Sequence, residues 1–566
     1  LRSAANKFGA IYSKPGNGIC HQLTLERFSR PGWVMLGADS HTPTAGGVGM
    51  LAIGVGGMDI AVALGGGLFY LPAPKVVRVL LSGQLPPWSS AKDVILEILR
   101  RLTVKGNVGT ILEYAGEGVK TLSVPERGTI CNMGTELGIT TSIFPSDEVT
   151  RQFLRAQQRE EDWQEISADA DAAYSRTIEI DLSSIAPMAA CPHSPGNVVP
   201  LKELAARGPI PVDQVLIGSC TNSSYRDLMT VARLLKGRKA AKNVELGIAP
   251  GSRQVLEMIA GNGALADILA SGARILESAC GFCMGVGMSP KTNAVSVRTN
   301  NRNFEGRSGT MTAQCYLVSP ESAVAAALTG RLIDPSEANL SWQDIPLPET
   351  FPVDDSMFDY PDFTGEIVKG PNFGPAPQTP PPGDEIAGAA AIVLGDDVTT
   401  DHILPAGGLM KYRSNIPKYS EYVFSQIDPE FSARCHVIAD SGRSPVIVGG
   451  LGYGQGSSRE HAAICPMHLG VRAVIAKSME RIHRANLINF GILPLYFVRP
   501  EDHADIGAGD ELAIAGVFAL IDSGTGTVRN TTKGKDIPVS LPLSERQKDI
   551  LKHGGLLRYT KARAGG

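Results

Sequence analysis

The sequence predicts a multi-domain α/β protein. At 566 residues the chain is longer than one hydrophobic core supports, so it should divide into three or four domains. Short apolar runs alternate with helical patterns, which is typical of parallel or mixed sheets covered by helices. A Pro-rich stretch late in the chain interrupts this alternation. We therefore expect a large body of several α/β domains, joined by a linker to a separate C-terminal α/β domain.

The alternation justifies the elements of the body in chain order. Expected strands cover residues 76–81, 110–114, 215–217, 244–248 and 315–318. Expected helices cover residues 90–102, 130–137, 225–235, 254–259 and 321–328. Ser90 suits the N-cap position of the first helix, because a serine hydroxyl can accept a hydrogen bond from a first-turn amide.

The linker contains K-G-P-N-F-G-P-A-P-Q-T-P-P-P-G-D, a composition that favours an extended, semi-rigid chain. Beyond it, apolar runs at 390–394 and 445–448 open an independent α/β unit. The resulting division has a first α/β domain at 1–74, a second at 75–190, a third at 191–345, the linker at 346–388 and the C-terminal domain at 389–566.

Composition narrows the functional classes. The formal net charge of −4 gives no sign of a nucleic-acid-binding surface, so an anionic ligand must be met by local arginines. Nine cysteines in so long a chain indicate a reducing compartment rather than a disulfide scaffold. No apolar run is long enough to span a membrane. The sequence begins at Leu1 rather than at Met, so a targeting segment ahead of Leu1 is compatible with it.

Three cysteines point to a metal centre: Cys220 in G-S-C-T-N-S, and Cys280 and Cys283 in A-C-G-F-C. Thiolates suit zinc, Cu(I) and iron–sulfur clusters. Three ligands are one fewer than a closed zinc site or a fully ligated cubane cluster needs. An iron left open could bind substrate as a Lewis acid. All three cysteines follow apolar runs, at the βα corners where α/β sheets bind ligands. A redox pair and a structural zinc site are the alternatives.

A second candidate site is Y-G-Q-G-S-S-R-E-H, which runs from Tyr453 to His461 after an apolar strand. Its glycines predict a tight turn into a helix, whose N-terminal amides would attract an anion. Arg459 could clamp a carboxylate with two hydrogen bonds. A serine held there could act as a base if amides and the guanidinium stabilised its alkoxide. A phosphate loop or a well-capped helix is the alternative.

Two further groups carry functional side chains. Asp39, Ser40 and His41 stand at a strand end, where they could hold and protonate a hydroxyl or water. For this motif by itself, a simple Asx or Ser turn with an incidental histidine is the better explanation. His21 by itself is most simply a structural histidine. Three arginines lie in polar loops and together would suit a substrate with several carboxylates: Arg302, Arg307 and Arg413.

Taken together, these strings resemble the aconitase family. The matching motifs, in the family's order, are G-A-D-S-H-T-P, T-I-C-N-M-G-T-E-L-G, G-S-C-T-N-S, A-C-G-F-C, N-R-N-F-E-G-R, T-T-D-H-I and Y-G-Q-G-S-S-R-E-H-A-A. They cover nearly the whole chain. The resemblance implies three α/β domains around an iron–sulfur cluster and a linker-tethered C-terminal swivelling domain.

The resemblance also implies roles for individual residues. A [4Fe–4S] cluster, one per chain, would be held by Cys220, Cys280 and Cys283, with one iron not bound by cysteine and with Asn132 and Asn301 hydrogen-bonded around it. Ser457 matches the base. The matches to acid/base and water-positioning residues are Asp39, His41, His21, Glu136 and Asp401. The matches to substrate binders are Asp39, Ser40, His41, Arg302, Arg307, Arg413, Ser458 and Arg459.

The implied activity is aconitate hydratase, a tricarboxylic acid cycle lyase that converts citrate to isocitrate through cis-aconitate. Alternatives within the family are homoaconitase, 2-methylcitrate dehydratase and isopropylmalate isomerase. Arg413 favours a third carboxylate, and fusion of the two parts into one chain favours aconitase over the split isomerases. An RNA-binding iron sensor is a further alternative, expected only of a cluster-free form.

The family carries a segment ahead of P-G-x-G-I-x-H-Q that supplies a substrate-binding Gln and an Asp-His pair. This sequence begins after that segment, so we expect the first domain to be incomplete and the 566-residue chain alone to have greatly reduced activity. We expect a monomer without a membrane partner. We expect it in the cytoplasm, or in the mitochondrial matrix if a transit peptide precedes Leu1.

Overall fold

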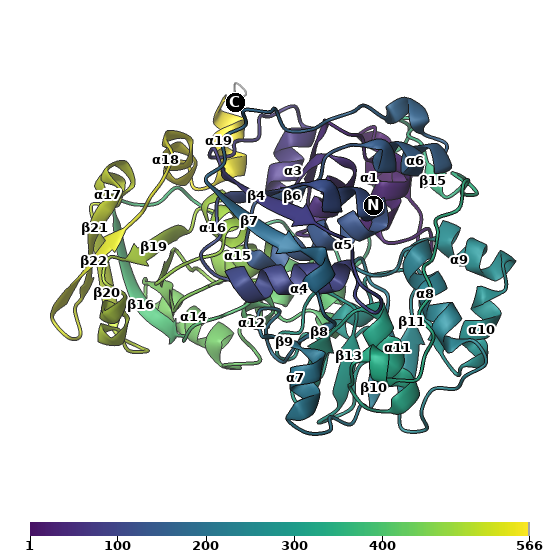
Figure 1. The fold of residues 1–566 in the computed structure, drawn as a ribbon. Helices are drawn as coiled ribbons and strands as arrows, with labels where there is room; N and C mark the ends of the chain where they lie inside the picture. Colours follow the sequence, from purple (N-terminus) through teal and green to yellow (C-terminus); the bar gives the residue numbers. More distant parts are fainter. Residues whose placement is uncertain (378, 564–566) are drawn as a thin grey trace. The chain divides into compact units, whose positions relative to one another are not determined.

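The computed structural model describes residues 1–377 and 379–563 and divides into two compact units (Figure 1). Unit 1 comprises Leu1–Leu36, His41–Ile53 and Pro72–Lys369. Unit 2 comprises Gly37–Ser40, Gly54–Leu71 and Gly370–Gly566. Two short segments from the first 71 residues therefore belong to the same unit as the C-terminal part of the chain. Both units combine sheets and helices, which confirms the multi-domain α/β class.

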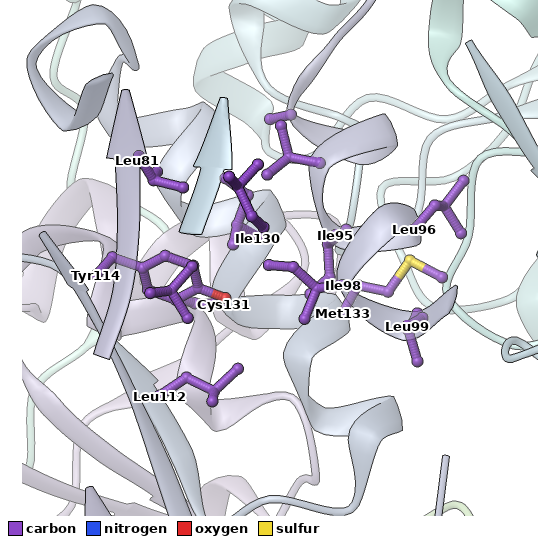
Figure 2. Close-up of a cluster of buried hydrophobic side chains, with 14 of the residues drawn as sticks. Leu81, Ile95, Leu96, Ile98, Leu99, Leu112, Tyr114, Ile130, Cys131 and Met133 are labelled. Carbon is purple, nitrogen blue, oxygen red and sulfur yellow. The ribbon is translucent and has the colours of Figure 1, made fainter. Parts of the chain in front are cut away.

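A four-stranded parallel sheet forms one part of unit 1, in the order β6-β5-β4-β7. Its strands are β4 (Lys75–Ser82), β5 (Thr110–Ala115), β6 (Thr141–Ile143) and β7 (Arg176–Asp181). Helices α4 (Ala91–Leu102) and α5 (Val124–Gly134) pack together beside it. Figure 2 shows the resulting core, in which Leu81, Leu112 and Tyr114 from the strands meet Ile95 and Ile130 from the helices.

A seven-stranded sheet forms the other large part of unit 1, in the order β12-β11-β10-β13-β14-β8-β9. Its strands are β8 (Met188–Ala190), β9 (Val198–Pro200), β10 (Gln214–Ile217), β11 (Glu245–Ile248), β12 (Arg274–Ile275), β13 (Val295–Arg298) and β14 (Gln314–Leu317). The five strands from β12 to β14 are parallel. The chain first builds outward from β10 through β11 to β12, then returns to place β13 on the other side of β10. Such a switch point opens a crevice at the carboxyl ends of the strands.

The helices connected with this sheet are α7 (Leu201–Ala206), α8 (Tyr225–Leu235), α9 (Arg253–Gly261), α10 (Ala264–Ala270) and α11 (Pro320–Thr329). The remaining helices and strands of the first 360 residues, apart from α3, are α1 (Arg2–Lys7), β1 (Tyr12–Ser13), α2 (Cys20–Leu23), β2 (Val34–Gly37), β3 (Leu51–Gly54), α6 (Glu148–Ala156) and β15 (Phe358–Asp359).

The start of the expected linker, 346–388, packs on unit 1. Strand β15 pairs antiparallel with β1. Asp355 accepts two hydrogen bonds from Arg27, at 2.9 and 2.8 Å, and Phe351 is buried. Gln378 within the Pro-rich stretch lies outside the described residues. The next strand begins at Glu385 rather than at residue 390, so the expected start of the C-terminal sheet was wrong by five residues.

Unit 2 is built around a closed barrel in the order β16-β17-β18-β19-β22-β21-β20. Its strands are β16 (Glu385–Val393), β17 (Ser444–Gly449), β18 (Ala473–Ala476), β19 (Leu493–Phe497), β20 (Glu511–Ala515), β21 (Thr525–Asn530) and β22 (Lys535–Ser540). Side chains alternate between two cores along β17: Val446 and Val448 join one cluster, and Ile447 between them joins the other.

The helices of unit 2 are α3 (Gly57–Leu64), α12 (Thr400–Ile403), α13 (Ile416–Ser420), α14 (Phe431–Asp440), α15 (His461–His468), α16 (Arg481–Asn489), α17 (Val517–Ser523), α18 (Glu545–Lys552) and α19 (Leu556–Arg563). Helix α3 precedes the others by more than 300 residues, yet Met58 packs against both cores of the unit. The Met58 amide donates to Glu460 at 2.9 Å, and Asn489 donates to Asp59 at 3.1 Å.

Several expected elements are confirmed, and the helix expected at 130–137 is wrong in its bounds. Helix α8 has the expected limits, and Ser90 caps α4 by accepting from the Lys92 amide at 3.3 Å. The helix expected at 130–137 instead starts at Val124, because Ser123 and Glu126 form a capping box with Pro125 inside the first turn. It ends at Gly134, and a 3₁₀ turn follows. No helix among the described residues has the length and hydrophobicity needed to cross a bilayer.

Candidate functional site

The three cysteines lie at the carboxyl ends of strands in the seven-stranded sheet. Cys220 follows β10 by three residues, and Cys280 and Cys283 follow β12. The next strand, β13, ends at Arg298 and leads into the run Thr299–Asn303. Strands β10 and β13 flank the switch point, so the loops that follow them meet where a parallel sheet binds its ligands.

Two consecutive asparagines hold two of these sulfurs. The side-chain amide of Asn301 donates to Cys220 Sγ at 3.3 Å, and that of Asn300 donates to Cys283 Sγ at 3.3 Å. Arg307 Nη2 lies 3.8 Å from the same Cys283 sulfur. Because Asn300 and Asn301 are neighbours in the chain, they bring Cys220 and Cys283 to one place.

The electrostatics favour a thiolate at Cys283. A hydrogen bond from Cys280 lowers the pKa of the Cys283 thiol well below its usual range, and Arg307 and Asn300 act in the same direction against the effect of burial. Burial instead raises the pKa of Cys435 to about 12. Thiolates are the metal-binding form of cysteine, so the Cys220, Cys280 and Cys283 set fits an iron–sulfur cluster.

Asn132 on α5 connects the cysteine loops to a neighbouring part of unit 1. Its side-chain oxygen accepts from Asn301 at 3.0 Å and from Thr221 at 3.1 Å, and its amide donates to Thr44 at 2.9 Å. The buried Asn132 is thus fixed on both sides. It contacts Asn301, the other residue expected to surround the cluster.

A buried acidic centre stands one helical turn further along the same segment. Glu136 Oε1 lies 2.9 Å from His41 Nε2 and 3.0 Å from Arg302 Nε. Burial by itself would raise the pKa of Glu136, but Arg302 and His41 together hold it below its ordinary value. The carboxylate is therefore ionised and oriented. The rings of His21 and His41 are 6.2 Å apart, edge to face, and both are buried.

The Gly-Ser-Ser-Arg segment lies in unit 2 between β17 and α15. Gly454 and Gly456 take positive φ values of 83° and 106°, which a residue with a side chain rarely adopts. The Ser457 amide donates to Thr400 Oγ1 at 3.1 Å, and the Arg459 amide donates to Ser457 Oγ at 3.3 Å. A nearby amide dipole therefore already points at the oxygen of Ser457.

This segment differs from the expected helix N-terminus. Helix α15 begins only at His461, with Glu460 as its N-cap, so Ser457–Arg459 form a loop that precedes the helix. The amides of Ser457 and Arg459 are occupied within the loop. Ser458 is buried, and its hydroxyl donates to the Ala38 carbonyl at 2.9 Å.

Arg459 is held by a second segment of unit 2. Its guanidinium donates to Asp401 Oδ1 at 3.0 Å and to the Leu404 carbonyl at 2.5 Å. Both side chains of this ion pair are about nine-tenths buried. Asp401 therefore orients Arg459. The Arg413 side chain is exposed, and its carbonyl contacts His461 Nε2 at 2.8 Å.

The expected site residues are divided between the two units. Unit 1 contains His21, His41, Asn132, Glu136, Cys220, Cys280, Cys283, Asn301, Arg302 and Arg307. Unit 2 contains Asp39, Ser40, Asp401, Arg413, Ser457, Ser458 and Arg459. Within unit 1 the structure brings together the cysteines with Asn132 and Asn301, and Glu136 with His41 and Arg302. Within unit 2 it brings together Ser457, Arg459 and Asp401.

Sequence reasoning missed two residues beside the cysteines. Asn300 contacts Cys283 as closely as Asn301 contacts Cys220, and the doubled asparagine was the available signal. Lys92 on α4 is fully buried and donates to the carbonyls of Thr299 and Asn300 at 2.9 and 2.6 Å. Burial lowers its pKa to about 7. Nothing in the helical pattern distinguishes this lysine from one that faces solvent.

Comparison with known proteins shows similarity to aconitases over nearly the whole chain. The Aconitase family (aconitate hydratase) model matches residues 1–330, and the Aconitase C-terminal domain model matches residues 415–500. The chain is 36% identical to the probable mitochondrial aconitate hydratase of Caenorhabditis elegans, over 99% of this chain and 80% of that protein.

Two fungal relatives are similarly close. The mitochondrial homocitrate dehydratase of Saccharomyces cerevisiae is 34% identical, over 99% of this chain and 80% of the relative. The mitochondrial aconitate hydratase of Candida albicans is 35% identical, over 100% of this chain and 81% of the relative. The motifs, the fold and these matches agree, and the chain is a hydro-lyase that belongs to the aconitase family.

Proposed function

We propose that this hydro-lyase is an aconitate hydratase, which interconverts citrate and isocitrate through cis-aconitate. The observation that carries the proposal is the three-cysteine centre, in which amide and guanidinium groups point at the sulfurs of Cys220 and Cys283. Relatives at about 35% identity that are named aconitate hydratases support the same reaction.

Cys220, Cys280 and Cys283 would hold a [4Fe–4S] cluster. Three thiol ligands and the donors of Asn300, Asn301 and Arg307 fit such a group, because hydrogen bonds to cysteine sulfur stabilise the anionic thiolates. When bound, the cluster supplies a Lewis-acidic iron that polarises a substrate hydroxyl.

The protein's own groups would handle the protons. Ser457 would remove the proton from the carbon next to a carboxylate, and the Arg459 amide that donates to its Oγ would stabilise the alkoxide. Glu136 would keep His41 oriented for proton transfer to or from the hydroxyl. Asp401 would act through Arg459, because it fixes the guanidinium that binds a substrate carboxylate.

The remaining roles follow the family resemblance. Asp39, Ser40 and His21 would position substrate and water. Arg302, Arg307, Arg413 and Ser458 would bind carboxylates. We also propose that the chain has four domains and one linker, with boundaries after residues 74, 190, 345 and 388.

The test is anaerobic reconstitution with iron and sulfide, followed by ultraviolet assay of cis-aconitate formed from citrate and from isocitrate. We expect a brown protein whose activity requires iron and decays in air. A colourless protein would remove the cluster from the proposal. A brown protein that acts on neither substrate would point to another hydroxy acid, or to a requirement for the family's segment that precedes P-G-x-G-I-x-H-Q.

Homocitrate is the second candidate substrate, because the yeast relative of 34% identity is named a homocitrate dehydratase. Replacement of Arg413 tests whether the substrate has a third carboxylate, because this arginine is the expected partner of that group. Arg413 is exposed, so its replacement should not disturb the core. Arg413→Leu should reduce kcat/KM for citrate by about 10²-fold or more, and should affect a dicarboxylate far less. Equal losses on both substrates would contradict this role.

The chain would act as a monomer on a tricarboxylate. The relatives named above are described as mitochondrial, which favours the matrix over the cytoplasm for this chain. Binding of an RNA hairpin that disappears on cluster assembly would instead favour the iron-sensor alternative.

A further inference from the structure

A polar cavity lies in unit 1 where the first turns of several helices meet. It has a volume of about 280 Å³, well above the roughly 30 Å³ that one water occupies in the liquid. Residues from the first turns of α4, α5, α8 and α11 line it, together with Trp342 and Asp344 from the segment after residue 340. None of the residues assigned to the hydro-lyase site lines this cavity.

Two hydrogen-bond acceptors of the lining are buried without a partner among residues 1–377 and 379–563. Asn222 is 3% exposed, and its amide donates to Asp227 at 3.1 Å, which fixes the orientation of the side chain. Among the described residues, Asn222 Oδ1 and Glu321 Oε2 are buried without a hydrogen-bond partner. Both residues line the cavity. Leaving such oxygens unpaired costs stability that a bound donor would recover.

The charge of the lining is negative. Glu126, Asp227, Glu321 and Asp344 contribute carboxyl groups, and Arg226 is the single basic side chain among the lining residues. The guanidinium of Arg226 is already engaged by Asp344 at 2.9 Å, by Glu126 at 3.4 Å and by the Ile345 carbonyl. These acidic side chains attract a cation that can also donate hydrogen bonds, and they act against the partial positive charge of the surrounding helix N-termini.

The spacing of the acids argues against a single metal ion. In the part of the chain that the structure describes, no three acidic side chains of this cavity bring their oxygens within 4.8 Å of one another. Trp342 adds an aromatic face at the rim, where it is 40% exposed. An alkylammonium group suits both features, because it donates to separated oxygens and packs against an aromatic ring.

We propose that this cavity binds a small organic cation, of the class of aliphatic diamines, through Asn222 and Glu321 with Trp342 at the entrance. The site is separate from the hydro-lyase residues and does not depend on their assignment. One ammonium group would donate to Asn222 Oδ1 and to the Glu321 carboxylate.

Binding should be coupled to proton release. The pKa of Glu321 is raised to about 8, mainly by burial and also by Asp93 on α4 and Asp227 on α8, while Arg226 acts in the opposite direction. The free cavity therefore holds Glu321 largely protonated at pH 7, whereas a bound ammonium favours the carboxylate. The affinity for the diamine should rise between pH 6 and pH 8.

The experiment is calorimetric titration of the full chain with 1,4-diaminobutane at constant ionic strength. We expect one site per chain, a proton released at pH 7, and an affinity reduced about 10- to 100-fold by Glu321→Gln. Glu203→Gln is the matched control, because Glu203 is exposed and lines a different surface depression. It should bind like the unmodified chain.

Trp342→Leu is a second variant that leaves the buried acids in place, and it should weaken binding severalfold. No binding at millimolar diamine would overturn the proposal, as would equal affinities of the Glu321→Gln and Glu203→Gln variants. Displacement of the diamine by MgCl₂ at an ionic strength where NaCl has no effect would reassign the cavity to a metal ion.

Discussion

At the scale of single residues, the asparagine pair 300–301 has the most direct influence on the proposed cluster. Each side-chain amide donates to a different cysteine sulfur, and the two bonds have the same length of 3.3 Å. Hydrogen bonds to ligand sulfur stabilise the charge on a cluster and the orientation of its ligands. Asn300 therefore belongs to the functional set together with Asn132 and Asn301.

Asn300→Ala should weaken retention of the reconstituted cluster about 10- to 100-fold, the usual effect of removing a hydrogen bond around a metal site. The rate of iron release to a chelator measures this. Asn243→Ala is the control, since Asn243 donates to the Val212 carbonyl away from the cysteines. Equal release rates for the two variants would show that the Asn300 contact does not stabilise the cluster.

Glu26 is a second residue whose environment should have a measurable effect, here on the pH dependence of stability. It is fully buried and accepts hydrogen bonds from Gln22 at 2.9 Å and Ser252 at 2.7 Å, yet burial outweighs both and raises its pKa to about 7. An acid whose pKa is higher in the folded state binds its proton more tightly there. Its contribution to stability therefore declines as pH rises from about 4.5 to 7.

Glu26→Gln should remove this decline. Relative to the variant, the unmodified chain should lose about 2–3 kcal/mol of unfolding free energy between pH 4.5 and pH 7. Denaturant unfolding at a series of pH values gives both curves. Parallel curves across that interval would mean that Glu26 titrates normally in the folded chain.

At the scale of elements, the loop between β17 and α15 depends on close packing against helix α16. A side chain at Gly454 would place its Cβ 2.3 Å from the ring of His483, and φ at this position is +83°. His483 is buried, and burial lowers its pKa to about 3, so a neutral ring supports the loop. The loop that carries Ser457 thus rests on a residue 26 positions further along the chain.

Gly454→Ala should lower both stability and turnover. Gly442→Ala is a matched control, because Gly442 has a similar φ of +76° but open space around it. The control should cost about 1 kcal/mol of unfolding free energy from backbone strain, and Gly454→Ala should cost at least about 2 kcal/mol more from the clash. Similar losses in the two variants would indicate that the His483 ring moves aside freely.

The sequence was most informative for elements with local signals. The helical pattern gave the limits of α8, Ser90 marked the start of α4, and the apolar runs before Cys220 and Cys280 placed these cysteines after strands. Local signals failed for Lys92, because a helix that is buried nearly all round leaves no polar face to identify. They also failed at β16, where Gly388 and four alanines weaken the strand pattern.

At the scale of the whole molecule, the chain crosses between its two units several times before residue 72. This arrangement was not predictable, since it depends on pairings between residues more than 400 positions apart. Helix α3 packs through Met58 and Val62 on the core of unit 2, and Arg481 donates to the Gly54 carbonyl at 2.9 Å. Unit 2 is therefore incomplete without residues 54–71.

A fragment of residues 370–566 should consequently be less stable than the same fragment fused to residues 54–71. The difference should be several kcal/mol, because two apolar side chains and three part-buried hydrogen bonds are lost. Thermal unfolding of both fragments measures it, with a fusion carrying Met58→Asp as the control. Identical melting temperatures for all three would show that α3 adds nothing to this unit.

The early position of α3 also sets an order of events during synthesis. Gly54 and Arg481 are separated by 427 residues, so the partners of α3 leave the ribosome long after the helix itself. At about 5–20 residues per second, this interval is on the order of 20–90 s. During that time Met58 and Val62 are exposed, because the residues they pack against have not yet been synthesised. Holdase chaperones that recognise apolar segments should therefore engage nascent chains of this protein at residues 54–71.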